Sequence, residues 1–244
     1  MLHSIRRVLR HFADRYAFAR VCAVCGTVLE PGERLMCMRC LLTMPRCRER
    51  GVSMIDGNAP ILNAAIPVAM VEAWMIYDPA SDYASLIRDA KYNDRPGQAR
   101  ELGRLFAADL LRRPFADGEV HPDGIDVLLP VPMHWTKRMR RGYNQSEEIA
   151  LGMAEVLGCA TGDNLVAVKP HGTQTKLSYS GRARNIKGCF AIEHGDELEG
   201  LNVAVVDDII TTGASMGEAA MAMSTGAAGA ASLSFLAIGA THRR

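Results

Sequence analysis

The alternation of apolar and polar positions along the chain predicts an α/β protein. The pattern is clearest at residues 203–206, a β-branched run that follows a turn at Gly200 and is typical of a buried parallel strand. Helical spacing begins near Ser215, so this stretch is a strand, a tight turn and the start of a helix. Other strands are expected within 66–77 and at 126–131, 165–168, 189–192 and 231–238, and helices from residue 82, after Gly97 and from Asn144. We therefore expect a mostly parallel sheet flanked by helices.

The N-terminal quarter follows different patterns. Residues 2–20 place apolar side chains on one helical face and arginines elsewhere, which predicts a basic amphipathic helix over 1–20. This helix packs on the protein itself or, alternatively, faces a membrane surface or DNA. Residues 51–64 are rich in turn formers and indicate a linker. The predicted organisation is a helix at 1–20, a small domain at 21–50 and the α/β domain at 60–244.

Four cysteines in two C-x-x-C pairs define the small domain. Cys22 and Cys25 form one pair, and Cys37 and Cys40 the other. Two such pairs suit a tetrahedral four-thiolate zinc site, which would be structural because the ligands fill every position. A module with two disulfides is the alternative reading of this spacing. The three other cysteines are expected to be small buried apolar residues.

Composition and charge limit the classes of function and the cellular compartment that fit this chain. The 244-residue chain has a net charge of +1, so it shows no global attraction to nucleic acid. Residues 1–50, however, contain ten arginines against four acidic residues and carry +6, which leaves about −5 for the rest. Arg46, Arg48 and Arg50 belong to this basic region, which is either a solvated surface or a nucleic-acid patch. No apolar run approaches ~18 residues, so we expect no membrane span. Seven cysteines, four of them in two close pairs, indicate a metal ion and a reducing compartment, and we expect the cytoplasm.

The turn after residue 206 has the chemistry of a sugar-phosphate site. Backbone N–H groups and a helix N-terminus attract a phosphate there, and hydroxyls add donors. Asp207 and Asp208 suit the hydroxyls of an attached sugar or, through water, a metal ion. An ordinary strand–turn–helix corner is the alternative. The turn residues expected on the phosphate are Thr211, Thr212, Gly213, Ala214 and Ser215.

A second polar cluster follows the strand at 126–131. Four cations and a glycine leave the C-terminal end of that strand, where open α/β sheets bind ligands. They are Lys137, Arg138, Arg140, Arg141 and Gly142. A second phosphate group is the expected partner, with a solvated run of charges as the alternative. The polar stretch 169–188 is long enough to be a loop over the site or a disordered segment.

These motifs resemble known families. The segment 203–215 resembles the 5-phosphoribosyl-1-pyrophosphate (PRPP) motif of type I phosphoribosyltransferases. The four-cysteine pattern, Leu86 to Tyr92, Arg141-Gly-Tyr-Asn-Gln145 and Gln174 to Asn185 together resemble the ComF family over nearly the whole chain. This resemblance implies a phosphoribosyltransferase fold behind a zinc ribbon, PRPP with Mg²⁺, and a role in DNA uptake or in the use of imported DNA. It also implies a pyrophosphate loop at 133–144 and a flexible loop at 170–188. The same resemblance makes Lys91, in the matching segment Leu86 to Tyr92, a further candidate site residue. The flexible-loop residues that carry the resemblance are Gln174, Ser178, Arg182 and Asn185.

Two functions fit this sequence. In one, the chain is an enzyme that transfers phosphoribosyl to a base or amine, with Asp208 as the candidate catalytic residue. In the other, it is a PRPP-responsive protein that handles single-stranded DNA, with Trp135 and Tyr143 as stacking platforms and DNA-uptake machinery as its partner. No residue pattern identifies an acceptor substrate, and the sequence sets no oligomeric state.

Overall fold

A computed structural model describes residues 20–48, 64–92, 96–113, 121–169 and 188–241. The chain divides into two compact units, Met1–Met44 and Pro45–Arg244, named here the N-terminal unit and the C-terminal unit. The helix expected at 1–20 and the linker expected at 51–64 lie, except for Arg20 and Ala64, outside the described residues. The predicted domain boundaries therefore stay a prediction.

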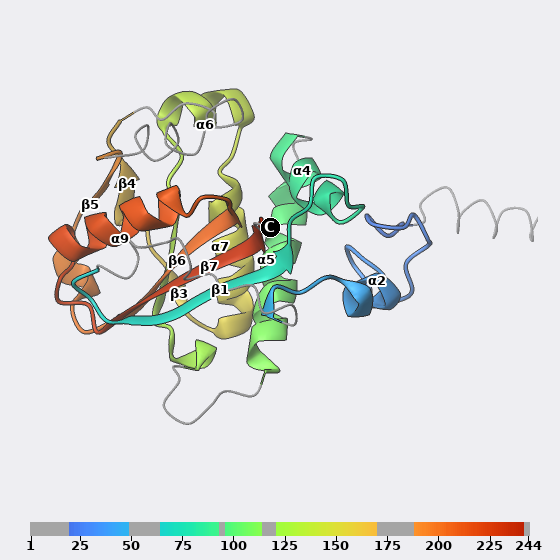
Figure 1. Ribbon diagram of the computed structural model, residues 1–244, viewed down its shortest axis with the longest axis horizontal. Helices are drawn as coiled ribbons and strands as arrows, with labels where there is room; N and C mark the ends of the chain where they lie inside the picture. Colours follow the sequence, from blue (N-terminus) through green and yellow to red (C-terminus); the bar gives the residue numbers. More distant parts are fainter. Residues whose placement is uncertain (1–19, 49–63, 93–95, 114–120, 170–187, 242–244) are drawn as a thin grey trace, which may run out of the picture. The chain divides into compact units, whose positions relative to one another are not determined.

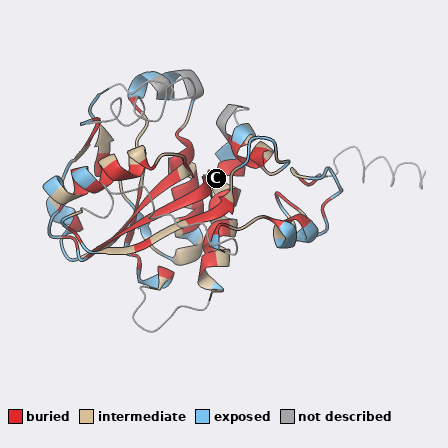
Figure 2. Cartoon of the chain, in the orientation of Figure 1, coloured by how far each residue is buried: buried red, intermediate tan, exposed pale blue. Residues whose placement is uncertain are grey.

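A five-stranded parallel sheet forms the centre of the C-terminal unit (Figure 1). The strand order is β1-β7-β6-β2-β3, and each neighbouring pair is parallel. All nine positions of β7 are buried, because helices cover both faces of the sheet at its centre (Figure 2). The predicted α/β class with a mostly parallel sheet is confirmed. The strands are β1 (Val68–Ile76), β2 (Val127–Pro130), β3 (Ala160–Thr161), β6 (Asn202–Ile210) and β7 (Ser232–Ala240).

Helices pack on the two faces of this sheet. Helix α9 (Ala214–Gly226) lies on one face, and its Met216 and Met223 join Val205 and Phe235 in a buried core (Figure 1). Helices α5 (Pro96–Leu111) and α7 (Gln145–Leu157) cover the other face. This three-layer arrangement leaves the ends of the strands as the place where a ligand can reach the sheet.

The contact between α5 and α7 depends on two glycines. A Cβ atom at Gly103 would lie 2.1 Å from the Ile149 carbonyl oxygen, and one at Gly152 would lie 1.9 Å from the Arg100 carbonyl oxygen. Both distances are far below a van der Waals contact. Glycine is therefore what allows these two helix backbones to approach so closely.

A separate two-stranded antiparallel sheet stands beside α9. It consists of β4 (Leu165–Ala167) and β5 (Phe190–Ile192), which the sequence pattern found but could not assign to a sheet. Because β4 and β5 pair, the segment 170–187 between them connects the two strands of a hairpin. That segment lies outside the described residues. The short edge strand β3 was missed, since two exposed residues leave no apolar pattern.

The segment after the N-terminal unit extends the sheet. The Ile76 N–H donates to the Pro45 carbonyl at 2.8 Å, and the Cys47 N–H donates to the Trp74 carbonyl at 3.2 Å. These bonds lay residues 45–47 antiparallel along β1, which would otherwise present an open edge. Burial raises the pKa of the Cys47 thiol to about 12, as expected for an inert apolar cysteine.

Arg46 is held within this same edge. Its guanidinium lies 3.3 Å from Asp109 of α5, and its side chain is only 14% exposed. Asp109 also accepts hydrogen bonds from Trp74 Nε1 and Arg113. Including Arg46 in a basic DNA-binding surface was therefore wrong: its charge is paired inside the C-terminal unit. Arg48 is exposed, and Arg50 lies outside the described residues.

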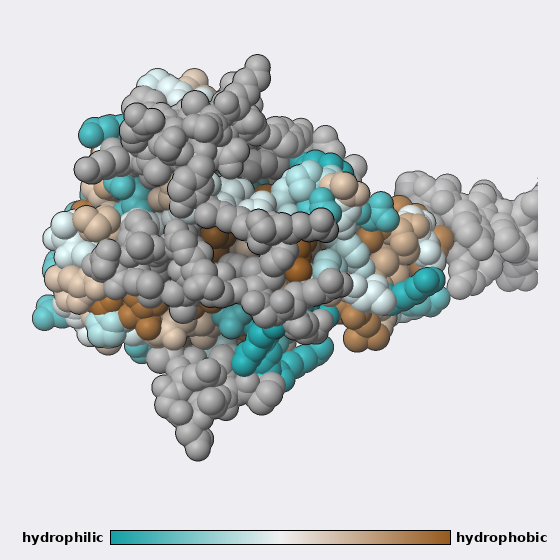
Figure 3. Space-filling model, in the orientation of Figure 1, coloured by the Kyte–Doolittle hydropathy of each residue, from teal (hydrophilic) through white to brown (hydrophobic). Residues whose placement is uncertain are grey.

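In the described part of the chain, no helix is both long and apolar enough to cross a membrane. Where Figure 3 leaves described residues visible, polar and apolar surface are intermixed.

Candidate functional site

The segments that carry the predicted site residues follow β2 and β6, two strands that end side by side. These strands are parallel, and their last register pair is Pro130 with Val206. The Val131 N–H donates to the Val206 carbonyl at 2.8 Å, so the two strands separate only beyond this hydrogen bond. The acidic pair lies just beyond this point on β6. The segment that follows β2 and the turn that follows β6 therefore leave the same edge of the sheet.

The acidic residues lie inside β6 and not in the turn. The sequence pattern ended this strand at Val206, but β6 continues to Ile210 because β7 still pairs with it there, as in the pair Asp207 and Ala237. Neighbouring residues of a strand point to opposite sides. Asp207 and Asp208 therefore leave the strand in different directions.

Asp207 is buried and makes two defined hydrogen bonds. One carboxylate oxygen, Oδ1, accepts from the Ser146 hydroxyl at 3.0 Å and from the Asp208 N–H at 2.8 Å. The residue is 9% exposed, whereas Asp208 is partly exposed. Ser146 is the second residue of α7, so this contact joins the end of β6 to the first turn of α7.

The turn after β6 leads directly into α9. Gly213 has a φ of 71°, a conformation that favours glycine, and Ala214 and Ser215 are the first residues of the helix. The Thr212 hydroxyl accepts from the Ala214 N–H at 3.3 Å, and the Thr241 hydroxyl donates to the Thr211 carbonyl at 3.2 Å. A helix N-terminus that follows such a turn presents N–H groups and a positive dipole end to an anion.

The cations expected in a pyrophosphate loop lie on a short helix, α6 (Trp135–Arg141). His134 caps its start, with Nδ1 accepting from the Thr136 N–H, and Gly142 ends it with a φ of 83°. The Arg138 guanidinium lies 3.2 Å from Glu147 of α7. The segment 133–144, expected to be a loop, contains a helix because the cap and the terminal glycine satisfy the ends of that helix. The pyrophosphate role of its cations stays a prediction. Helix α6 contains the four cations predicted from the sequence, Lys137, Arg138, Arg140 and Arg141, and Gly142 follows its last residue.

The residues after α6 connect it to α4 (Ala84–Tyr92). The Tyr143 hydroxyl and the Gln145 side-chain amide both donate to the Ala90 carbonyl, the latter at 3.4 Å. Asn144 caps α7 by accepting from the Ser146 N–H and donates to the Val131 carbonyl at 3.0 Å. Lys91 follows Ala90 and so lies in the last turn of α4.

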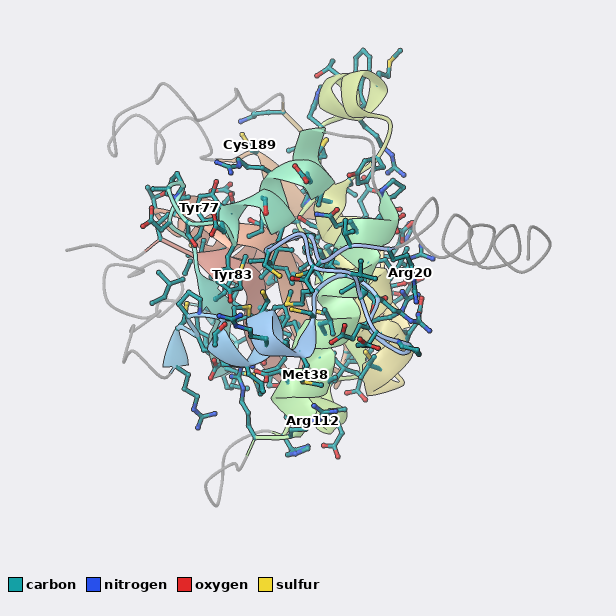
Figure 4. All side chains as sticks on the ribbon, turned by 90° about the vertical axis from the view of Figure 1, so that its right-hand side faces the viewer. Arg20, Met38, Tyr77, Tyr83, Arg112 and Cys189 are labelled. Atoms are coloured by element: carbon teal, nitrogen blue, oxygen red, sulfur yellow. The ribbon has the colours of Figure 1, made fainter. Side chains whose placement is uncertain are left out.

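The Tyr143 hydroxyl is bound to α4 and its ring is half-buried, and its role as a stacking platform stays a prediction. Trp135, in contrast, is 64% exposed. The connection from β1 to α4 runs between Tyr77 and Tyr83, which are labelled in Figure 4.

The predicted flexible-loop residues Gln174, Ser178, Arg182 and Asn185 lie outside the described residues. The described end of that segment is held by α9. Glu218 accepts hydrogen bonds from the N–H groups of Gly188 and Cys189, the latter at 3.1 Å. Sequence reasoning missed Glu218 and also Ser146, since each is a single polar residue in a helix without a motif.

The four cysteines of the N-terminal unit form one cluster. The sulfur atoms of Cys22, Cys25, Cys37 and Cys40 all lie within 4.8 Å of one another, and those of Cys25 and Cys37 are 3.8 Å apart. Tetrahedral Zn–S bonds of about 2.3 Å place sulfur atoms at about this separation. All seven cysteines are free thiols in the structure, so the disulfide alternative is not supported. The residues present fit a metal ion.

Local structure explains how the two cysteine pairs meet. The Gly26 N–H donates to the Cys22 carbonyl at 2.9 Å and closes the first turn. The Cys37 N–H donates to the Cys22 sulfur at 3.3 Å, and Glu33 accepts from the Met38 N–H at the start of α2 (Met38–Thr43). A hydrogen bond with Thr27 lowers the pKa of Cys25 to about 6, whereas burial raises the pKa of Cys40.

Several known proteins are similar to this chain in sequence. No family model matches the chain. It is similar to the DNA utilization protein YhgH of Salmonella typhi, with 33% identity over 152 residues, 60% of this chain and 65% of that protein. It is similar to competence protein F of Haemophilus influenzae, with 35% identity over 95 residues, 38% of this chain and 42% of that protein. Competence protein ComFC of Bacillus subtilis is 28% identical over 98 residues, 40% of this chain and 38% of that protein. The chain spans less than two thirds of the length of each of these relatives.

Among solved structures, the glutamine PRPP amidotransferase of B. subtilis complexed with ADP and GMP matches with a TM-score of 0.39. It is 18% identical, and the match covers 62% of this chain and 30% of that one.

Proposed function

Because the chain belongs to the ComF family, we propose that it is a PRPP-binding, phosphoribosyltransferase-like protein that acts in the uptake or use of DNA. The relatives' names, DNA utilization protein and competence protein, support the connection to DNA. The proposed place of action is the cytoplasm, with single-stranded DNA and the DNA-uptake machinery as partners.

One observation carries the PRPP part of this proposal. The turn into α9 follows the acidic end of β6, and the cationic helix α6 follows the neighbouring parallel strand β2, so these segments leave the same edge of the sheet. PRPP combines a sugar, a 5-phosphate and a pyrophosphate, and this edge offers a partner to each. Asp208 suits the ribose hydroxyls, the turn Thr211 to Ser215 suits the phosphate, and the cations of α6 suit the pyrophosphate.

Two metal ions belong to the proposal. The four-cysteine cluster suits Zn²⁺, since four thiolates close the coordination sphere and leave no position for chemistry. Mg²⁺ prefers oxygen ligands and several waters, so it would accompany the pyrophosphate and not occupy a protein cage. Asp208 is the protein carboxylate best suited to approach such an ion through water, because it is partly exposed at the site.

The test is calorimetric titration of PRPP into the full chain with Mg²⁺. We expect saturable binding that inorganic pyrophosphate competes away. Absence of binding at high protein concentration would contradict the proposal. A parallel assay of pyrophosphate release against a panel of bases and amines, with and without single-stranded DNA, separates binding from transfer. Release that depends on one acceptor would establish the enzyme alternative.

A further inference from the structure

Glu218, in the second turn of α9, lies where this helix meets the β4–β5 hairpin. We infer that Glu218 is a positioning residue of the proposed PRPP site: it fixes the residues just before β5 relative to the turn Thr211 to Ser215. This inference rests on the proposed function, because that turn is the part of the site expected to hold the phosphate. It gives Glu218 no contact with the ligand itself.

The first argument is how Glu218 is bonded. Its Oε1 atom accepts hydrogen bonds from the N–H groups of Gly188 and Cys189, the latter at 3.1 Å. Two successive backbone N–H groups that converge on one carboxylate hold it firmly, because both hydrogen bonds are charge-assisted. Gly188 has a φ of 67°, a conformation that favours glycine, so any residue with a side chain would strain this junction.

The second argument is how the rest of the hairpin is held on α9. Ile192, the last residue of β5, packs against Gly226: a Cβ atom at Gly226 would lie 2.6 Å from the Ile192 Cβ. Phe190, the first residue of β5, lies in the same buried core as Met223. Apolar packing therefore holds β5 itself, whereas Glu218 holds the two residues that precede it.

The third argument is what this junction connects. The Val168 N–H donates to the Cys189 carbonyl at 2.8 Å, so the hairpin is still paired close to both ends of the segment 170–187. The turn Thr211 to Ser215 leads into the first turn of α9, and Glu218 follows the first residue of that helix by four positions, about 6 Å along its axis. One helix therefore carries both the expected phosphate turn and the carboxylate that holds the hairpin.

Two substitutions of Glu218 separate its hydrogen bonds from its charge. Glu218→Gln keeps a side-chain oxygen that can accept both N–H groups, and it removes a negative charge near the expected phosphate. Glu218→Met is similar in length but has only a weak sulfur acceptor, so it removes the hydrogen bonds and the charge together. Gly188→Ala disturbs the same junction from the other side, because alanine disfavours the positive φ. Ile192→Val is the control, since it weakens the apolar contact with α9 and leaves the junction intact.

The experiment measures PRPP affinity by calorimetry with Mg²⁺ on the full chain, well below the melting temperature of each variant. Glu218→Gln should bind PRPP as tightly as the wild type or up to about threefold more tightly, because a repulsive charge is removed. Glu218→Met and Gly188→Ala should bind roughly three- to thirtyfold more weakly, as residues that act without touching the ligand do. Ile192→Val should melt at a lower temperature and bind PRPP like the wild type.

Hydrogen exchange at Cys189 and Phe190 is the second readout, and protection there should fall in Glu218→Met and remain in Glu218→Gln. A Glu218→Met protein that binds PRPP like the wild type would overturn the inference. So would a Glu218→Gln protein that binds as weakly as Glu218→Met, because the charge and not the junction would then matter. Equal loss of affinity in Ile192→Val would show only a general effect of stability and would also overturn it.

If the wild type binds no PRPP, the proposed function fails and the positioning of its phosphate turn fails with it. Hydrogen exchange in the Glu218 variants then still decides whether Glu218 fixes the junction before β5. If the wild type binds and Glu218→Met binds equally well, the proposed function stands and only the positioning role is lost.

Discussion

At the scale of single residues, the strongest constraints in the C-terminal unit come from small or buried polar side chains. Gly103 and Gly152 set the distance between α5 and α7, and Ser146 and Asn144 set where α7 meets the strands. None of these residues carries a charge at neutral pH. They decide the geometry of the site because α7 is the element that β2, β6 and α4 all contact.

Replacing Gly103 by alanine should destabilise the protein by about 1–3 kcal/mol, since the new methyl group would overlap the Ile149 backbone and force α5 and α7 apart. Denaturant unfolding of the full chain measures this. The matched control is Gly97→Ala on the same helix, where a Cβ meets nothing within 4 Å. That control should be neutral or stabilising by about 0.4–1 kcal/mol. Equal stability of the two variants would show that the helices can separate without cost.

At the scale of elements, the N-terminal unit and the C-terminal unit are each stabilised internally by different means. The C-terminal unit has a five-stranded sheet in which one interior strand, β7, is buried along its whole length. The described part of the N-terminal unit has one six-residue helix and a few backbone bonds around four thiols. A segment this small rarely supplies enough apolar burial, and a structural metal ion replaces the missing core.

Removing the metal should therefore unfold residues 20–44 and leave the parallel sheet folded. Hydrogen exchange followed by mass spectrometry, with and without a strong chelator, measures both units in one sample. Protection should be lost at 20–44 and retained in β6 and β7. Because metal binding requires deprotonated thiols, the metal should also be released more easily as the pH falls. A chelated sample with full protection at 20–44 and no bound metal would contradict the metal role.

At the scale of the whole molecule, charge is distributed unevenly. The net charge is +1, while residues 1–50 carry +6 by sequence. Of the arginines there, Arg34, Arg39 and Arg48 are exposed, whereas Arg46 is paired with Asp109. A second group of cations lies on α6, beside the exposed Trp135 and Met139. With a net charge this small, contact with DNA phosphates would depend on such local groups of cations.

Single-stranded DNA should bind with low sequence preference and with an affinity that falls steeply with salt, because phosphate contacts release counterions. Changing Arg34, Arg39 and Arg48 to glutamine should weaken DNA binding and leave PRPP binding unchanged. Changing Arg138, Arg140 and Arg141 should weaken both, since pyrophosphate and DNA phosphates would compete for α6. The measurement is a salt titration of labelled DNA with and without PRPP.

Arg46→Gln is the control for this titration. It should lower the melting temperature by breaking the contact with Asp109, and it should leave DNA affinity at equal salt unchanged. DNA binding that ignores PRPP would place the DNA away from α6. No measurable binding at low salt would remove the DNA part of the proposed function.

The sequence by itself determined the features that depend on local pattern. Apolar runs gave four of the five parallel strands and the helices α4, α5, α7 and α9, and the paired C-x-x-C spacing predicted the four-thiol cluster. The sequence also places 207–215 and 137–142 directly after two predicted strands. Because parallel strands end on the same side of a sheet, both segments are expected at one edge of the sheet.

Only the tertiary structure decided what depends on partners distant in sequence. Asp207 and Asp208 look alike in the chain, but Ser146, 61 positions away, makes one of them buried and bonded. Arg46 reads as a surface cation, yet Asp109, 63 positions away, pairs with it. The acidic pair lies in a strand because β7 continues beside it. Burial and pairing arise when separate elements come together, and periodicity within one element carries no information about them.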